Sequence, residues 1–206
     1  MYLDNCGLSV LTQTRNLGIT VSNNLSPIAH VMDIVSKAHR QSALILHAFT
    51  SQGIKLLICA YVVYVWPLLE HNIVIWTPQF LKDIEAIMWV QLCFTKHVRW
   101  YGNYSSPERL CLLKMHSWEL RRLVIDLVWC YKIVFHVVDT CIDDLFFTHC
   151  PSTCSHPDKL YKPHFSTNIW AHFFSQHVIN VWNSLPADII NLGSVKMLAF
   201  SPQNRS

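Results

Sequence analysis

The chain is poor in charged residues and carries little net charge. Asp, Glu, Lys and Arg make up 14% of its 206 residues, the net charge is +3, and apolar residues make up 51%. A charge this small does not indicate a strongly basic nucleic-acid-binding domain, because non-specific affinity grows with the number of phosphates that are neutralised. The large apolar share predicts exposed apolar surface.

The sequence also lacks a segment typical of export or of membrane insertion. Its first residues have neither the basic stretch nor the apolar stretch of a secretory signal. The longest apolar run, Leu56 to Leu69, is shorter than the roughly 20 residues that cross a bilayer, and it contains Pro67. We therefore expect a buried helix here, no membrane partner, and an intracellular protein of the cytoplasm or nucleus that is not secreted.

The eight cysteines do not indicate disulfides, because no secretory signal accompanies them. His149, Cys150, Cys154 and His156 are of the residue types that bind zinc. However, the Cys154-x-His156 spacing is tighter than that of the usual zinc-binding pairs. We expect no metal site and no cofactor, and a small helical Cys/His metal-binding or membrane-associated protein remains the alternative.

Hydrophobic periodicity predicts a mainly helical chain with a short N-terminal hairpin and an irregular C-terminal segment. Alternation through residues 17–21 predicts a strand, with residues 8–11 as its antiparallel neighbour. Helices are expected over about 27–50, over 54–70, and from 78 onward; the second is apolar all round and should be central. Ser105 begins a capping box and Ser117 begins a longer helix. Trp76 and Trp182 lie in apolar surroundings and are expected in the core.

Several short segments follow one another in the order and spacing of one known family. The most specific is HVINVWNSLP at 177–186, which is similar to the pattern RVxxWNxLP. The others are DLVWCYKI (126–133), ERL with ELRR (108–110, 119–122), VQLCFTK (90–96), YVWPLLEH with WTP (64–71, 76–78) and NLGITV (16–21). Over roughly residues 2–200, the chain resembles the C-terminal part of the reverse transcriptases of non-LTR (LINE-type, jockey-like) retrotransposons.

The resemblance implies three regions: a primer-grip-like hairpin at the end of the palm (1–24), a helical thumb-like domain (25–136), and a C-terminal segment (137–206) with a loop at 148–168. In the family, the carboxylates that hold two metal ions lie in the palm, upstream of the primer grip. The resemblance therefore implies a fragment of an RNA-directed DNA polymerase that has no catalytic residues of its own, no bound Mg²⁺ and no small-molecule substrate. A missing palm segment is an expected partner.

The tandem pair Asp143-Asp144 is not expected to replace the palm carboxylates. The residues before it are Cys141-Ile142, whereas the family has an aromatic residue two positions before the pair. No third carboxylate lies on a nearby predicted strand. A solvated helix start is the interpretation that we favour.

In the family, the thumb helices hold the template–primer duplex by its phosphates. The implied partner is RNA or an RNA–DNA duplex, bound without sequence specificity. Basic residues of the predicted helices that suit this role are Lys37, Arg40, Lys96, Arg99, Arg109, Arg121 and Arg122. Ordinary solvated helix faces are the alternative for each of them.

At five positions the chain has Trp, Cys or His where the family pattern has arginine: Trp66, Cys93, Cys154, Trp170 and His177. Arginine codons that begin with CG become codons for these residues by one transition. The hypothesis is a mutationally decayed copy of a mobile element, and a translated relic without function is a further alternative.

Overall fold

The computed structural model describes residues 2–3, 6–7, 11–49, 53–78, 80–139, 159–161, 174–186 and 190. The chain divides into two compact units, Met1–Leu113 and Lys114–Ser206. The division between Leu113 and Lys114 falls within the range 25–136 of the expected thumb-like domain.

The first unit begins with two short antiparallel hairpins. β1 (Tyr2–Leu3) pairs with β2 (Cys6–Gly7), and β3 (Gln13–Asn16) pairs with β4 (Ile19–Ser22). The predicted hairpin exists, but residues 8–11 are not the partner of the strand at Ile19. The nearer segment takes that place because a two-residue turn at Leu17-Gly18 brings Asn16 directly opposite Ile19.

Both residues of this turn have left-handed backbone angles. The φ angle is 47° at Leu17 and 85° at Gly18, as in the turns that match the twist of a two-residue hairpin. The φ angle favours glycine at this position, and a Cβ atom added at Gly18 would lie 3.2 Å from His71 Nε2, a tight contact. Leu17 has no such compensation, because its side chain is 82% exposed.

Replacing Leu17 by Asn is expected to stabilise the protein by about 1 kcal/mol, because Asn tolerates the left-handed region and leucine does not. The free energy of unfolding in urea measures this effect. Leu11→Asn is the matched control, since Leu11 is also exposed but has no positive φ. Equal effects of the two substitutions would contradict the account of the turn.

The first helix, α1 (Ile28–Ala48), follows the predicted range closely. Val31, Val35 and Ala38 are buried, as their helical spacing predicts, and Ile45 extends the same face. The opposite face carries an Asp33–Lys37 ion pair with 2.6 Å between Oδ2 and Nζ. An amphipathic helix of this kind packs against neighbours along one side only.

The single helix predicted over 54–70 is wrong in two respects. The structure has α2 (Ile54–Tyr64) and α3 (Trp66–Glu70), separated at Val65, followed by an unpredicted short helix α4 (Ile73–Trp76). Pro67 accounts for the break, because proline has no N–H to continue the helical hydrogen bonds. The predicted all-round burial also fails, since only Leu57, Ala60 and Tyr61 of α2 are buried.

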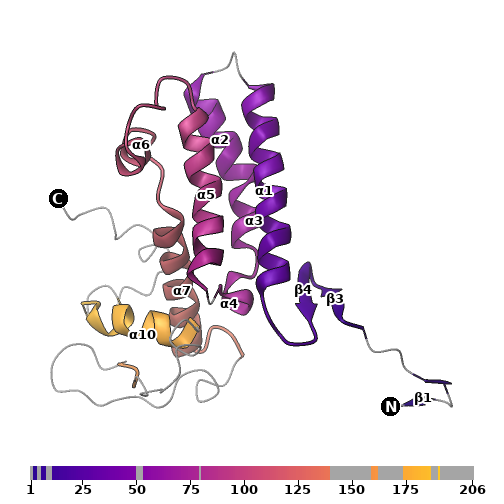
Figure 1. Ribbon diagram of the computed structural model, residues 1–206. Helices are drawn as coiled ribbons and strands as arrows, with labels where there is room; N and C mark the ends of the chain where they lie inside the picture. The colour runs from indigo at the N-terminus through magenta and orange to yellow at the C-terminus, as the bar shows by residue number, and fades with distance from the viewer. Residues whose placement is uncertain are drawn as a thin grey trace. The chain divides into compact units, whose positions relative to one another are not determined.

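α5 (Leu81–His97) and α6 (Ser106–Leu112) complete the first unit. Ser105 and Glu108 form the predicted capping box, with the Ser105 N–H and Oγ both donating to Glu108 Oε2. In Figure 1, α1 and α5 run side by side, with α2 and α3 behind them. Tyr61 stacks on Phe94 in this core, with ring centroids 4.2 Å apart.

The second unit contains α7 (Trp118–Val134), which packs against α10 (Phe174–Ser184). Ser117 caps α7 as predicted, since its Oγ accepts a hydrogen bond from the Leu120 N–H. Asn183 holds Leu160 by two hydrogen bonds, donating to its carbonyl and accepting from its N–H. Trp182 is fully buried, which confirms its predicted place in the core and explains the WN pair of the motif.

The prediction of a mainly helical chain with a short N-terminal hairpin is confirmed. Trp76 is also buried, as expected. Within the ranges that the structure describes, no helix is both long and apolar enough to cross a membrane. Asp143-Asp144, the group from His149 to His156, Trp170 and nearly all of the loop at 148–168 lie outside the described residues.

Candidate nucleic-acid interface

A groove with a volume of about 500 Å³ runs between α1 and α5 in the first unit. Its walls contain three histidines and one cysteine. The lining residues are His39, Ser42, Ala43, Leu46 and His47 from α1, and Cys93, Phe94 and His97 from α5. Ser42 and Phe94 are buried, and the Ser42 hydroxyl has no hydrogen-bond partner in the described part of the chain. The groove therefore offers polar groups above an apolar base.

Three of the predicted basic residues lie close in sequence to residues that line this groove. Arg40 lies three residues before Ala43 and seven before His47, so helical spacing places it on their strip of α1, where it is exposed. On α5, Lys96 lies three residues after Cys93, and Arg99 follows just beyond the end of that helix; both are exposed. We call Arg40, Lys96, Arg99 and the lining of the groove the α1/α5 face.

Lys37 has a different environment. It lies one helical turn before Arg40 on α1, and its ammonium group is paired with Asp33. An ion pair of this type largely neutralises the charge that a phosphate would meet. Lys37 therefore contributes less to the α1/α5 face than Arg40 does.

Exposed aromatic side chains accompany these cations, and the sequence analysis did not single them out. Trp89 lies four residues before Cys93 on α5 and is 56% exposed. Trp100 follows Arg99, is 81% exposed, and has a φ of 76°, which is unusual for a bulky residue. The available signal was the helical spacing, which places Trp89 on the strip of Cys93 and Lys96, away from the buried Ile87 and Phe94.

Cys93 contributes no negative charge to the groove. Burial raises the pKa of the Cys93 thiol, while nearby Lys96 acts in the opposite direction. A thiol with a raised pKa is neutral near pH 7 and is a poor nucleophile or metal ligand. It therefore does not oppose the binding of an anion.

Arg109 lies inside the first unit and is only 5% exposed. Its Nη1 donates to the Tyr104 carbonyl at 2.6 Å, and its Nε donates to Thr95 Oγ1 at 3.4 Å. These bonds join the loop after α5 to the body of that helix. Arg109 therefore positions the loop that carries Trp100 instead of presenting its own charge to solvent.

In the second unit, Arg122 also turns inward and is 6% exposed. Its Nε lies 3.8 Å from Asp126 Oδ2, and its guanidinium lies over the Trp118 ring. Burial lowers the pKa of Arg122 and Asp126 raises it. These contacts indicate a structural role within α7.

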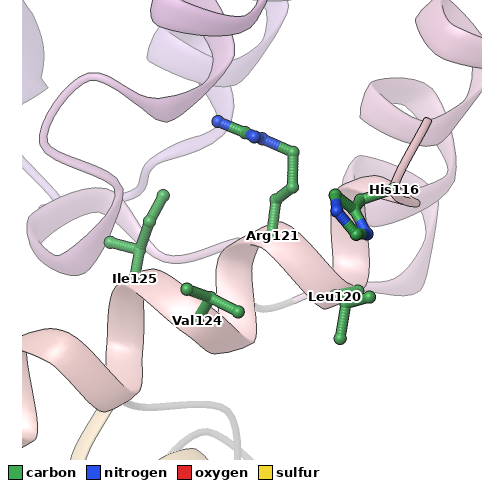
Figure 2. A pocket seen from close by; sticks show the side chains of 5 residues that line it. All are labelled: His116, Leu120, Arg121, Val124 and Ile125. Atoms are coloured by element: carbon green, nitrogen blue, oxygen red, sulfur yellow. The ribbon is translucent and has the colours of Figure 1, made fainter. Parts of the chain in front are cut away.

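Arg121 lines a separate pocket of about 270 Å³ at the start of α7. Figure 2 shows its long side chain extending away from the helix backbone, with His116 at the N-terminal end and Leu120, Val124 and Ile125 as the remaining walls. Both His116 and Arg121 already have interaction partners. The pocket therefore does not add to the α1/α5 face.

No group of three or more His, Cys, Asp or Glu residues arranged to hold a metal ion occurs in the described portion of the chain. Comparison of the chain with models of protein families, with curated proteins and with solved structures gives no match. The function must therefore be argued from the residues and from the geometry of the α1/α5 face.

Proposed function

We propose that the chain is a nucleic-acid-binding fragment that grips an RNA–DNA or RNA duplex without sequence specificity. It corresponds to the thumb and C-terminal segment of a non-LTR retrotransposon reverse transcriptase and has no polymerase activity by itself. Its place is inside the cell, in the cytoplasm or nucleus. Two observations support this proposal. Six segments of the sequence resemble motifs of that family, and the α1/α5 face contains exposed cations and lies near exposed aromatic rings.

The observation that carries the proposal is the combination of cations and exposed aromatic rings along one groove. Helical spacing places Arg40 and Lys96 next to residues that line the groove, on α1 and α5 respectively, and Arg99 and Trp100 follow the end of α5. Lysine and arginine bind the phosphate backbone irrespective of sequence, and exposed aromatic rings stack on bases of any type. A solvated helix face needs charged residues but has no need of two exposed tryptophans.

The test is the salt dependence of binding by the full chain to a fluorescent RNA–DNA duplex. With three cations at the α1/α5 face, the slope of log affinity against log salt should be between about −2 and −3, because each phosphate contact releases close to one counterion. Fluorescence anisotropy at several salt concentrations measures this slope. Affinity that is absent, or independent of salt, would contradict the proposal.

Two other interpretations are the alternatives. A translated relic of a decayed element would fold poorly or bind nothing, and the Trp and Cys at positions where the family pattern has arginine, such as Trp66 and Cys93, favour it. A Cys/His metal-binding protein would contain bound metal after purification, which elemental analysis detects. Neither alternative predicts a salt-dependent affinity for a duplex.

A further inference from the structure

A second pocket of the first unit, with a volume of about 310 Å³, is lined by the β3–β4 hairpin, α1 and the α3 segment. Arg15 and Gly18 come from the hairpin, His30, Asp33 and Lys37 come from α1, and His71 follows α3. We call it the His30 pocket. It is separate from the α1/α5 face, and the two share no lining residue.

His30, one of the lining residues, has a ring nitrogen without a hydrogen-bond partner in the described residues. The residue is only 2% exposed, and its Nδ1 accepts a hydrogen bond from the Thr20 N–H at 3.3 Å. The neutral ring must therefore carry its proton on Nε2. That atom is buried and has no hydrogen-bond partner in the described residues. An unsatisfied buried donor is unfavourable, so a ligand that accepts from it is favoured.

The charges around the pocket leave one cation in excess. Lys37 is paired with Asp33, and these two charges offset one another. His71 Nε2 lies 3.2 Å from the Leu17 carbonyl oxygen. Arg15 lies on β3, is exposed, and forms no ion pair within the part of the chain that the structure describes. The pocket therefore combines one unpaired guanidinium with one buried N–H donor.

Burial keeps the His30 ring neutral. It lowers the pKa of His30 from its usual 6.5; Asp33 raises that pKa, whereas Lys37, Arg15 and His71 lower it further. A neutral ring whose Nδ1 is occupied acts as a donor through Nε2 over the physiological pH range.

We propose that the His30 pocket binds a phosphate group, with Arg15 pairing with its charge and the Nε2–H of His30 donating to one of its oxygens. Phosphate suits this pair because guanidinium groups bind it through charge-assisted hydrogen bonds. Ile34, Pro67 and Leu68 line the same pocket and offer an apolar wall for the organic group that carries the phosphate. The proposal does not depend on duplex binding by the α1/α5 face.

Binding of inorganic phosphate to the full chain tests this proposal. Calorimetry should give a saturable isotherm, and NMR should show a shift of the His30 Nε2–H resonance along the titration. Arg15→Gln should weaken binding about tenfold or more, since hydrogen bonds to charged groups belong to the stronger class. His30→Asn retains an acceptor for the Thr20 N–H, but its shorter side chain has no donor at the position of Nε2, so it should weaken binding as well.

Lys55→Gln, on the exposed surface of α2, is the matched control and should bind as the wild type does. Arg15→Gln alters only an exposed strand residue, so it decides the outcome even if His30→Asn does not fold. No saturable binding of phosphate, or unchanged binding by Arg15→Gln, would overturn the proposal. Unchanged phosphate binding by a variant lacking Arg40, Lys96 and Arg99 separates this site from the duplex interface.

A competition experiment identifies the source of the phosphate. An oligonucleotide with a 5′-phosphate that displaces inorganic phosphate, while its unphosphorylated twin does not, supports the proposal with a nucleic-acid end as the ligand. If neither oligonucleotide displaces the bound inorganic phosphate, the proposal is still supported, and the ligand is a small phosphorylated compound.

Discussion

Replacing Arg40, Lys96 and Arg99 together by glutamine will lower the affinity for an RNA–DNA duplex about tenfold or more and will flatten the salt slope by about two to three. The reason is that each lost phosphate contact removes close to one released counterion from the binding equilibrium. All three side chains are exposed, so the fold should be unaffected. Anisotropy titrations at several salt concentrations give both quantities.

The control for this variant is Lys55→Gln, which removes an exposed cation from α2 and should leave the slope unchanged. A triple variant that binds with the wild-type slope would show that the α1/α5 face is an ordinary solvated surface. An equal loss in the Lys55 variant would show that only the net charge matters.

The positions at which the family pattern has arginine differ in how deeply they are buried. Cys93 lines the groove, so Cys93→Arg adds a cation to the α1/α5 face and should tighten duplex binding. Trp66 is 5% exposed and its ring meets that of Tyr61 edge-on, so an arginine there enters the core. If arginines were replaced at these positions, the replacement should have weakened nucleic-acid binding at Cys93 and altered the packing of the core at Trp66.

Phe94→Ala is expected to cost about 3 to 5 kcal/mol of unfolding free energy, the usual effect of removing a buried aromatic ring. Phe94 is 1% exposed, stacks on Tyr61, and lies at the base of the groove between α1 and α5. A loss of this size is a large part of the stability of an ordinary domain. Urea unfolding followed by circular dichroism measures it.

Phe80→Ala provides the comparison, because Phe80 is 49% exposed at the start of α5 and should cost less than about 1 kcal/mol. Helical spacing alone would place Phe80 on the same apolar stripe as Phe94. Similar losses for the two substitutions would contradict the packing of α5 described above.

The elements that depend on local signals were predicted well. The apolar spacing of α1 and the caps at Ser105 and Ser117 all act within one or two helical turns, and the structure shows them as expected. The break at Val65 was not predicted. The uninterrupted apolar run favoured one continuous helix in spite of Pro67. The partner of the strand at Ile19 was also missed, because Leu17 is an unusual residue for a left-handed turn.

The site was less accessible to sequence reasoning, because burial depends on contacts between distant residues. Arg109 and Arg122 look like surface cations in the sequence, but Tyr104 and Thr95 hold the first and Asp126 and Trp118 surround the second. Trp89 shows the reverse case, in which an aromatic residue remains exposed. Chain spacing alone does not show which face of a helix its neighbours cover.

Ultraviolet crosslinking of the full chain to a uniformly labelled RNA–DNA duplex tests the central claim most directly. Mass spectrometry of the linked peptides should identify attachment at Trp89 or Trp100, because these exposed rings flank the cations of the α1/α5 face and stack on bases within crosslinking range. The buried Trp76 and Trp182 serve as internal controls and should remain unmodified. Crosslinks confined to α2, or spread evenly over every exposed aromatic residue, would contradict the assignment of this face as the nucleic-acid interface.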